Sequence, residues 1–332
     1  MFSFDIPDSL IAQKPRSERD KSRLLVLYRD GSIEHRQFDK IADYLKAGDA
    51  LVLNDTKVIP VRLKCAKQNG DTIEILLTKK LQKNNYEIMS KGSFSGTAAL
   101  ENGINAQIKQ GSEVTFDYTG DIEDTLEEIG MTPLPPYIKR EADKEDAHKY
   151  QTVYARAKGS IAAPTAGLHF TEALINKIKN KGVNILTITL HIGIGTFKPI
   201  RVYNIEEHKM DQEFFEIDSA ALEKIQKTKN LGSRVFLVGT STTRALEAYI
   251  KGKFMKWENS NGKIRGFADL FIRPGYDFKA ADCIITNFHQ PNSTPLLLAC
   301  AKAGTEKLIN AYKEAIAVKY RFYSYGDAML IL

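Results

Sequence analysis

The sequence is poor in cysteine. Its 332 residues include three, Cys65, Cys283 and Cys300, and none belongs to a Cys-x-x-Cys pair. An odd, scattered set is typical of reduced thiols in a cytosolic protein. Cys283 and His289 lie close together in sequence, but a structural zinc site needs a full set of ligands, usually in tight pairs, and these are missing. We therefore expect a cytoplasmic protein without a bound metal.

Long apolar runs are absent as well. No stretch approaches the roughly 18 residues of a membrane span. The first residues, Met1-Phe2-Ser3-Phe4-Asp5, have neither the basic nor the apolar region of a signal peptide. The sequence also lacks a Walker A motif and a Gly-x-Gly-x-x-Gly fingerprint. These absences argue against a membrane protein, a P-loop enzyme and a standard dinucleotide-binding enzyme.

The composition is that of an ordinary globular protein, with 43% hydrophobic and 27% charged residues. The chain is long enough for two domains, or for one large domain that carries an insertion. Its formal net charge of +6 permits a polyanionic partner without requiring one.

A change in the spacing of apolar residues and glycines along the chain predicts an inserted domain. From about residue 63, short alternating runs such as Thr72–Leu77 are separated by regularly spaced glycines, a pattern that favours a small antiparallel barrel. A Pro-rich connector follows, and the densely charged stretch 139–149 is expected to be an exposed helix. We assign residues 1–62 and 149–332 to a main α/β domain and 63–148 to an inserted all-β barrel.

After residue 170 strands alternate with helices, which indicates an α/β domain with parallel or mixed strands. Helices are expected from Thr171 to Lys181, from Ser219 to Asn230, from Thr240 to Ile250 and from Leu296 to Tyr320, the last with a break at Gly304. Ligands of such domains collect at the carboxyl ends of the strands. Three loops are placed there: 191–196, 239–244 and 287–294.

Two histidines stand beside glycines in such loops, His169 and His191, and the two segments flank one helix. Both side chains are therefore expected to face one pocket, where a near-neutral pKa suits general acid–base catalysis. A lone histidine is more often a hydrogen-bonded structural residue. We treat the two readings as about equal.

The loop that begins at Gly239 leads into a helix. Its hydroxyls, its free backbone N–H groups and Arg244 suit a carboxylate or phosphate. The alternative is an ordinary Ser/Thr cap with a surface arginine. A basic stretch near the N-terminus, from Lys14 to Arg23, either meets phosphates or is simply a solvated face.

Several segments together resemble the S-adenosylmethionine:tRNA ribosyltransferase-isomerase family of queuosine biosynthesis. The resemblance runs in family order along nearly the whole chain and rests on the two histidine loops, the Gly239 loop and the segments 51–60, 135–140, 150–155, 271–276, 285–289 and 320–330. One departure is Gln290, where the family usually has leucine.

The resemblance implies a mixed α/β, barrel-like main domain with an inserted β-barrel. It also implies that the ribosyl part of S-adenosylmethionine is transferred and isomerised onto 7-aminomethyl-7-deazaguanine at the tRNA wobble position. The products would be epoxyqueuosine-tRNA, adenine and methionine. S-adenosylmethionine would thus be a co-substrate, with no metal, and we expect a monomer.

The reaction assigns roles to residues. His169 and His191 are the candidate proton-transfer groups. The co-substrate is expected to contact Gly193, Gly195, Thr196, Gly239, Thr240, Ser241 and Arg244. Contacts to RNA are expected from Arg23, Lys57, Arg62, Arg265, Arg273 and His289. Two rival classes stay open: an RNA methyltransferase, which would release S-adenosylhomocysteine, and a non-catalytic RNA-binding module.

Overall fold

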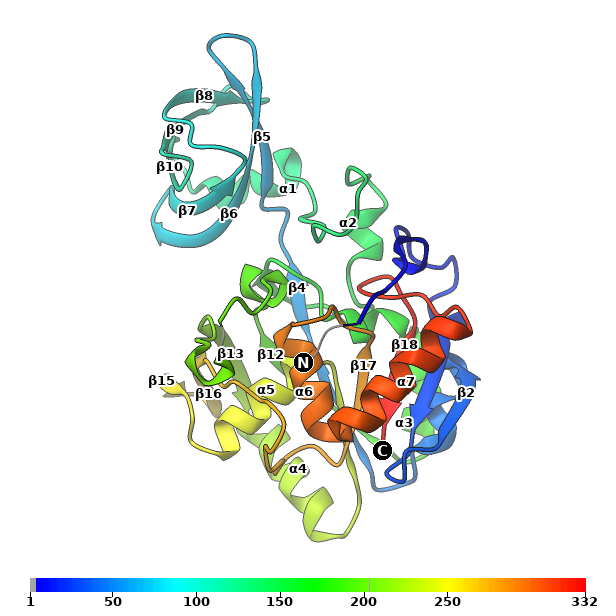
Figure 1. Cartoon of the computed structure of the whole chain (residues 1–332). Coiled ribbons are helices and arrows are strands. Elements are labelled where there is room, and N and C mark those ends of the chain that lie inside the picture. Colours follow the sequence, from blue (N-terminus) through cyan, green and yellow to red (C-terminus); the bar gives the residue numbers. More distant parts are fainter. Residues whose placement is uncertain (1–3, 203) are drawn as a thin grey trace.

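A computed structural model describes residues 4–202 and 204–332, except for the side chains of residues 258–260. Figure 1 shows a large α/β body and a small β-barrel that stands off from it, joined near β4 (Thr56–Val58). The mixed α/β class and the inserted all-β barrel are confirmed.

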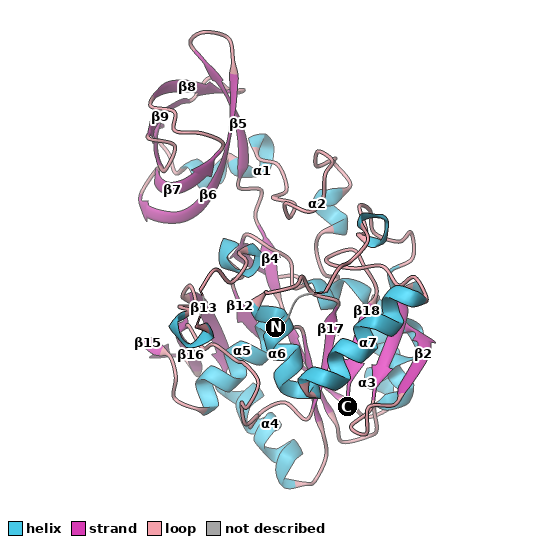
Figure 2. Ribbon diagram, in the orientation of Figure 1, coloured by secondary structure: helices cyan, strands magenta, loops and turns pink. Residues whose placement is uncertain are grey.

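A mixed sheet of ten strands forms the centre of the main domain, in the order β15-β16-β13-β12-β3-β14-β17-β18-β1-β2. It is open, with β15 and β2 at its edges, and Figure 2 shows helices around it. In the same order, its strands span Met255–Ser260, Lys263–Ala268, Glu213–Asp218, Asn184–Leu190, Ala50–Asn54, Val235–Val238, Cys283–Asn287, Ala328–Ile331, Arg23–Leu27 and Ile33–Gln37.

The central strands are parallel and apolar because both of their faces are covered. Strand β3 pairs in parallel with β12 and with β14, and β14 pairs in parallel with β17. Every residue of β3, β14 and β17 is buried. The carboxyl ends of these four strands therefore meet at one edge of the sheet.

The longer helices agree with the sequence predictions. They are α3 (Glu172–Asn180), α4 (Ser219–Asn230), α5 (Thr240–Ile250), α6 (Thr294–Ala303) and α7 (Thr305–Ala317). Thr171 caps α3 by accepting from the Leu174 N–H, and Asp218 caps α4 through the Ala220 N–H. The predicted break at Gly304 separates α6 from α7.

The remaining helices are short. The 3₁₀ turns are Asp8–Leu10, Arg19–Lys21, Phe38–Tyr44, Ile122–Asp124, Thr165–His169, Ile194–Phe197 and Ile205–Glu207, and the α-helical turns are α1 (Leu126–Ile129) and α2 (Asp146–Lys149). The prediction of an exposed helix over 139–149 is wrong except for its last four residues. Asp146 is buried there, because Arg140 and Tyr325 bind its carboxylate.

The barrel is closed and has six antiparallel strands, in the order β10-β7-β6-β5-β8-β9. In chain order they are β5 (Arg62–Lys67), β6 (Thr72–Gln82), β7 (Asn85–Ser90), β8 (Gly96–Leu100), β9 (Asn105–Lys109) and β10 (Glu113–Asp117). Alternate residues such as Ile73, Ile75 and Leu77 fill its own core.

The barrel is joined to the main domain through paired chain segments. The backbones of Arg62 and Met131 exchange hydrogen bonds, so the chain enters and leaves at one place. After this point Leu134, Ile138 and Tyr150 pack in a cluster with Ala12 and Tyr325 of the main domain. A two-stranded ladder of β4 and β11 (Ala157–Ser160) lies beside the junction.

Candidate active site

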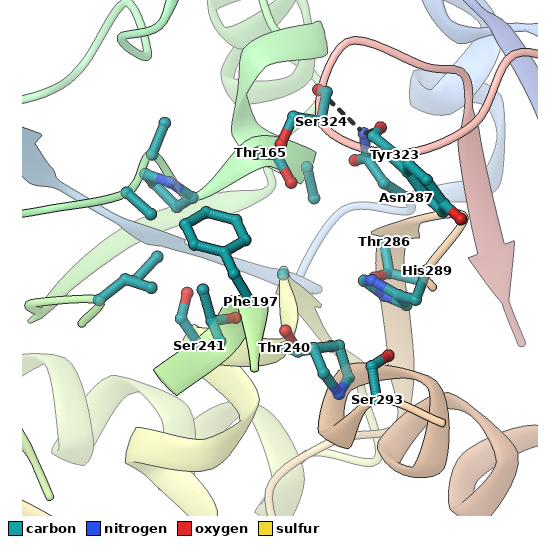
Figure 3. A pocket seen from close by; sticks show the side chains of 18 of the residues that line it. Thr165, Phe197, Thr240, Ser241, Thr286, Asn287, His289, Ser293, Tyr323 and Ser324 are labelled. Atoms are coloured by element: carbon teal, nitrogen blue, oxygen red, sulfur yellow. Dashed lines mark hydrogen bonds between the residues drawn. The ribbon is translucent and has the colours of Figure 1, made fainter. Parts of the chain in front are cut away.

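A cavity that is open to solvent lies where the carboxyl ends of β12, β14 and β17 meet, and the space free of protein atoms there is about 830 Å³, the solvent at its mouth included. Three chain segments supply most of its wall: 162–166, 239–244 and 286–295. The predicted residues among those that line it are Thr196, Gly239, Thr240, Ser241, Arg244 and His289. Figure 3 shows Phe197, Thr240 and Ser241 facing Asn287, His289 and Tyr323 across it.

The hydroxyls that open α5 do not cap it. The N-cap is Gly239, with a φ of 89°, and it provides no side-chain acceptor. Thr242 and Thr243 donate instead to the carbonyls of Val238 and Gly239. Ser241 accepts from Asn54 Nδ2 at 3.1 Å. The first backbone N–H groups of α5 thus border the cavity without an acceptor from their own cap, an arrangement that favours anions.

Arg244 is held by one buried carboxylate. Its Nη1 donates to Glu213 Oε2 at 2.6 Å, and Glu213 Oε1 accepts the Gly193 N–H at 2.9 Å. Both side chains are buried and line the cavity. Arg244 Nη2 is also buried but has no hydrogen-bond partner. Because an unpaired buried donor on a charged group is costly, this atom calls for an acceptor from a ligand.

The opposite wall is uncharged. His289 lies 2.7 Å from the Thr286 hydroxyl through Nε2, and burial lowers the pKa of His289 to about 3. Burial also raises the pKa of Tyr323 to about 12. A neutral imidazole and protonated phenols suit hydrogen bonds to an uncharged heteroaromatic ring. Gln290, the departure from the family pattern, lines this wall too.

We expected His169 and His191 to face one pocket. In the structure they lie in separate places. His169 lines a second cavity of about 500 Å³ with Arg16, Arg19 and Lys149. Its Nδ1 lies 2.8 Å from Ser22 Oγ and its Nε2 lies 3.3 Å from Asn287 Oδ1. Asn287 Nδ2 donates to the Tyr323 carbonyl, which orients the amide.

That orientation fixes the tautomer of His169. Since Asn287 Oδ1 only accepts, Nε2 carries the proton and Nδ1 accepts from Ser22. Burial lowers the pKa of His169 to about 4, so the ring is neutral at pH 7. Asn287 itself lines the first cavity. His169 thus reaches the first cavity through Asn287.

His191 lies on the other face of the sheet from the cavity-lining Ile192. Its Nδ1 lies 2.8 Å from the Thr56 hydroxyl, and its ring stacks on Phe214. Burial lowers its pKa, while Asp55 acts in the opposite direction. Gly159 passes so close that a Cβ there would lie 2.7 Å from His191 Nε2. The glycine therefore leaves room for the ring.

The predicted RNA contacts are spread over the molecule. Arg23 lies in β1 and Arg265 in β16, with six strands of the sheet between them. Arg62 pairs with Glu74 in the barrel, Arg265 with Glu216, and Arg273 with Glu206. Lys57 is in β4, beside the barrel junction. His289 is in the cavity wall, so these residues do not form one patch.

Sequence reasoning missed Glu213, Tyr137, Phe197 and Tyr323, which all line the cavity. A signal for Glu213 was present. The run Glu213-Phe214-Phe215-Glu216-Ile217 alternates, and its period places Glu213 on the buried face with Phe215 and Ile217. A carboxylate on a buried apolar face needs a cationic partner, and Arg244 is that partner. The three aromatic residues gave no comparable signal.

Within the described ranges, no group of three or more His, Cys, Asp or Glu side chains is placed to hold a metal ion. In the same part of the chain, every helix is too short or too polar to cross a membrane.

Comparisons with known proteins agree along the whole chain. The model of the family described as "Queuosine biosynthesis protein" matches residues 1–331. The S-adenosylmethionine:tRNA ribosyltransferase-isomerase of Thermodesulfovibrio yellowstonii is 51% identical, over 99% of this chain and 98% of its own length. The protein with the same name from Halothermothrix orenii is 48% identical, over 100% and 98%.

A solved structure is similar as well. The S-adenosylmethionine tRNA ribosyltransferase of Thermotoga maritima is 34% identical and has a TM-score of 0.57, over 100% of this chain and 99% of that one. In each comparison the similarity covers nearly the whole chain. The chain therefore belongs to the S-adenosylmethionine:tRNA ribosyltransferase-isomerase family of queuosine biosynthesis proteins.

Proposed function

We propose that the cavity at the carboxyl ends of β12, β14 and β17 is where this chain performs the activity of its family. The enzyme transfers and isomerises the ribosyl moiety of S-adenosylmethionine onto 7-aminomethyl-7-deazaguanine at the wobble position of tRNA. The products are epoxyqueuosine-tRNA, adenine and methionine. The observation that carries the location is the buried Arg244 Nη2, a charged donor without a partner in the cavity wall.

The amino-acid end of S-adenosylmethionine fits the wall formed by α5 and β13. Arg244 Nη2 and the first N–H groups of α5 donate to its carboxylate. Glu213, already bound to Arg244 and to the Gly193 N–H, accepts from its ammonium group. Thr196, Gly239, Thr240 and Ser241 complete this end, and Gly195 holds the adjoining turn. A Cβ on Gly195 would lie 2.5 Å from Asp211 Oδ2.

The uncharged wall fits a nucleobase. His289 stays neutral because it is buried, and it lies beside Thr286, Tyr137 and Tyr323. These neutral groups can form hydrogen bonds with adenine as it leaves. None of them places a charged group beside the base. His289, which we had placed among the RNA contacts, is assigned to this wall.

Of the two predicted histidines, His191 stays our candidate for proton transfer. His169, whose two ring nitrogens are both engaged in hydrogen bonds, is assigned a positioning role: it orients Asn287, whose amide borders the cavity. His191 lies beside the barrel junction, where it is hydrogen-bonded to Thr56 of β4. We place the RNA on this side of the cavity. The aminomethyl group must lose a proton to become a nucleophile, and a neutral imidazole accepts one.

Adenine release tests the function. The enzyme is incubated with S-adenosylmethionine and an anticodon stem-loop that carries 7-aminomethyl-7-deazaguanine, and an otherwise identical stem-loop with guanine is the control. We expect adenine and methionine from the modified stem-loop only. Equal release from both RNAs, or formation of S-adenosylhomocysteine, would contradict the proposal and favour a methyltransferase. No turnover at all would favour an RNA-binding module.

Arg244 tests the location. Arg244→Lys keeps a positive charge but loses the Nη2 donor. We expect the KM for S-adenosylmethionine to rise on the order of 30- to 100-fold, the effect of a lost charge-assisted hydrogen bond, with an unchanged KM for RNA. The Arg244→Gln, Glu213→Gln double variant is the folding control, because it leaves no buried carboxylate unpaired. An unchanged KM for S-adenosylmethionine would place that molecule elsewhere.

A further inference from the structure

One face of the β12-β13-β16-β15 part of the sheet carries a row of aromatic side chains that do not line the assigned cavity. Rings of His191 and Phe214 stack with centroids 5.3 Å apart. Phe214 then contacts Trp257 edge-on at 5.5 Å, and Trp257 stacks on Phe267 at 5.8 Å and 26°. The four rings, which we call the aromatic row, come from four neighbouring strands or strand ends.

The strand register explains why these rings share a face. Phe214 of β13 is directly opposite Phe267 of β16, and Phe267 is opposite Met255 of β15. Trp257 lies at an irregularity in the β15–β16 ladder, which turns its ring onto the same side. The alternate residues Phe215, Ile217 and Ala268 point the other way and are buried in the main core.

The outer end of the aromatic row is open. Trp257 is 63% exposed and Met255 is 54% exposed. A tryptophan at this exposure gains little from the protein's own core. His191, Phe214 and Phe267 are partly buried behind it. An exposed tryptophan and methionine that continue a row of partly buried rings are characteristic of a binding surface.

Cations border the aromatic row. Arg265 and Lys263 lie on the same face of β16, both paired with Glu216. At the inner end, Arg156 binds Asp55, which also accepts from Thr189 of β12, and the Arg156 side chain is 79% exposed. Flat rings between guanidinium and ammonium groups match the chemistry of unpaired nucleotides, whose bases stack and whose phosphates are negative.

The aromatic row and the cavity lie on opposite faces of the same strands, and they approach each other at the carboxyl end of β12, where His191 follows Leu190. Phe214 follows Glu213, and His191 precedes Ile192, and both Glu213 and Ile192 line the cavity. An RNA loop that passes over the carboxyl edge of these strands at His191 would extend from the aromatic row to the place assigned to S-adenosylmethionine.

We infer that the aromatic row is the platform on which unpaired bases of the tRNA anticodon loop stack, with Trp257 as the outermost stacking residue. The inference rests on the proposed function for the identity of the RNA. It assigns recognition of neighbouring loop bases to a surface outside the cavity. Stacking is tolerant of sequence, so this surface positions the loop while the cavity selects the modified base.

The chain has a single tryptophan, so its fluorescence reports on this surface alone. The full-length protein is titrated with the modified anticodon stem-loop, without S-adenosylmethionine. We expect saturable quenching whose midpoint equals the Kd from anisotropy of labelled RNA. A fully paired RNA hairpin of equal length and minimal loop should quench little. Absence of quenching by the stem-loop at saturation would overturn the inference.

Matched variants complete the test. Trp257→Ala should weaken stem-loop binding about 10-fold or more and raise the KM for RNA, while the KM for S-adenosylmethionine stays unchanged. Trp257→Phe should retain most of the affinity. Leu231→Ala is the control, since Leu231 is 70% exposed at the end of α4, outside the aromatic row.

Three outcomes separate the explanations. Normal RNA binding by Trp257→Ala, together with normal adenine release by the unchanged enzyme, overturns the platform alone. Loss of adenine release by the unchanged enzyme overturns the proposed function instead. Concentration-dependent self-association that Trp257→Ala abolishes, with RNA affinity unaffected, would assign the aromatic row to contacts between two copies of the chain.

Discussion

The environment of His169 differs from what its position in the sequence indicates. His169 follows a glycine-containing turn, which resembles an exposed catalytic loop, yet it is only 4% exposed and has hydrogen bonds at both nitrogens. The sequence contains His169, Ser22 and Asn287 far apart, and only the fold brings them together. Residue types at loop positions were therefore predictable, whereas their hydrogen-bond partners were not.

The lowered pKa of His169 predicts a pH-dependent stability. The folded protein holds the ring neutral down to about pH 4, whereas an unfolded histidine binds a proton near pH 6.5. Because the unfolded state binds more protons in this window, stability is lost as pH falls from about 6.5 towards 4. The contribution of His169 between pH 7 and pH 5 is about 2 kcal/mol.

Urea unfolding at the two pH values measures this effect. The His169→Asn variant should lose less stability on acidification than the unchanged protein, by about that amount. His148→Asn, at an exposed position, is the matched control. Parallel pH dependence of the unchanged protein and His169→Asn would show that His169 is not held neutral by the fold.

At the residue scale, the prediction about catalysis concerns His191. His191→Ala should lower kcat on the order of 100- to 10,000-fold, the usual range for a lost general base, with little change in melting temperature. Rescue of part of the rate by added imidazole would support proton transfer. A variant with near-normal kcat would mean that His191 serves only its contacts with Thr56 and Phe214.

At the scale of elements, helix and strand positions followed closely from periodicity and capping residues, as α3, α4, α6 and α7 show. Segments without a period were harder to predict. The connector 139–149 looked helical by charge, but Asp146 turns inward to Arg140 and the segment becomes irregular. The hydroxyls of α5 looked like a cap, but they bind carbonyls and Asn54. In the connector a tertiary partner outweighed the local preference. In α5 two hydroxyls bind carbonyls four residues earlier in the chain, and only Ser241 has a tertiary partner, Asn54.

A buried carboxylate on α5 secures a loop between two elements. Glu247 is fully buried and accepts the backbone N–H groups of Lys279, Ala280 and Ala281 and the hydroxyl of Tyr276. Glu247→Ala leaves these donors unpaired, so we expect a loss of about 3 kcal/mol or more in the free energy of unfolding.

Chemical denaturation measures this loss, and amide hydrogen exchange should localise it to residues 276–281. Glu223→Ala is the control, because Glu223 is an exposed glutamate on the neighbouring helix α4. Unchanged protection of residues 276–281 in Glu247→Ala would mean that the loop is held by other contacts.

At the scale of the whole molecule, the predicted boundaries 1–62, 63–148 and 149–332 imply that the barrel and the main domain fold independently of each other. The barrel strands lie within Arg62–Asp117 and have their own core, and the chain ends meet at the Arg62–Met131 bridge. Replacing residues 63–130 by a two-residue turn should therefore leave the main domain folded. Circular dichroism should show one cooperative thermal transition. Aggregation or a broad, non-cooperative transition would contradict independent folding.

The last strand of the chain, β18, lies between β17 and β1 inside the main sheet, and it pairs in parallel with β1 near the beginning of the chain. During synthesis the hairpin of β1 and β2 therefore cannot join the rest of the sheet until β18 has left the ribosome. A chain cut short by a few residues leaves the edges of both β1 and β17 unpaired, in a form open to chaperones and proteases. The arrangement makes the joining of β1 and β2 to the rest of the sheet depend on the synthesis of β18.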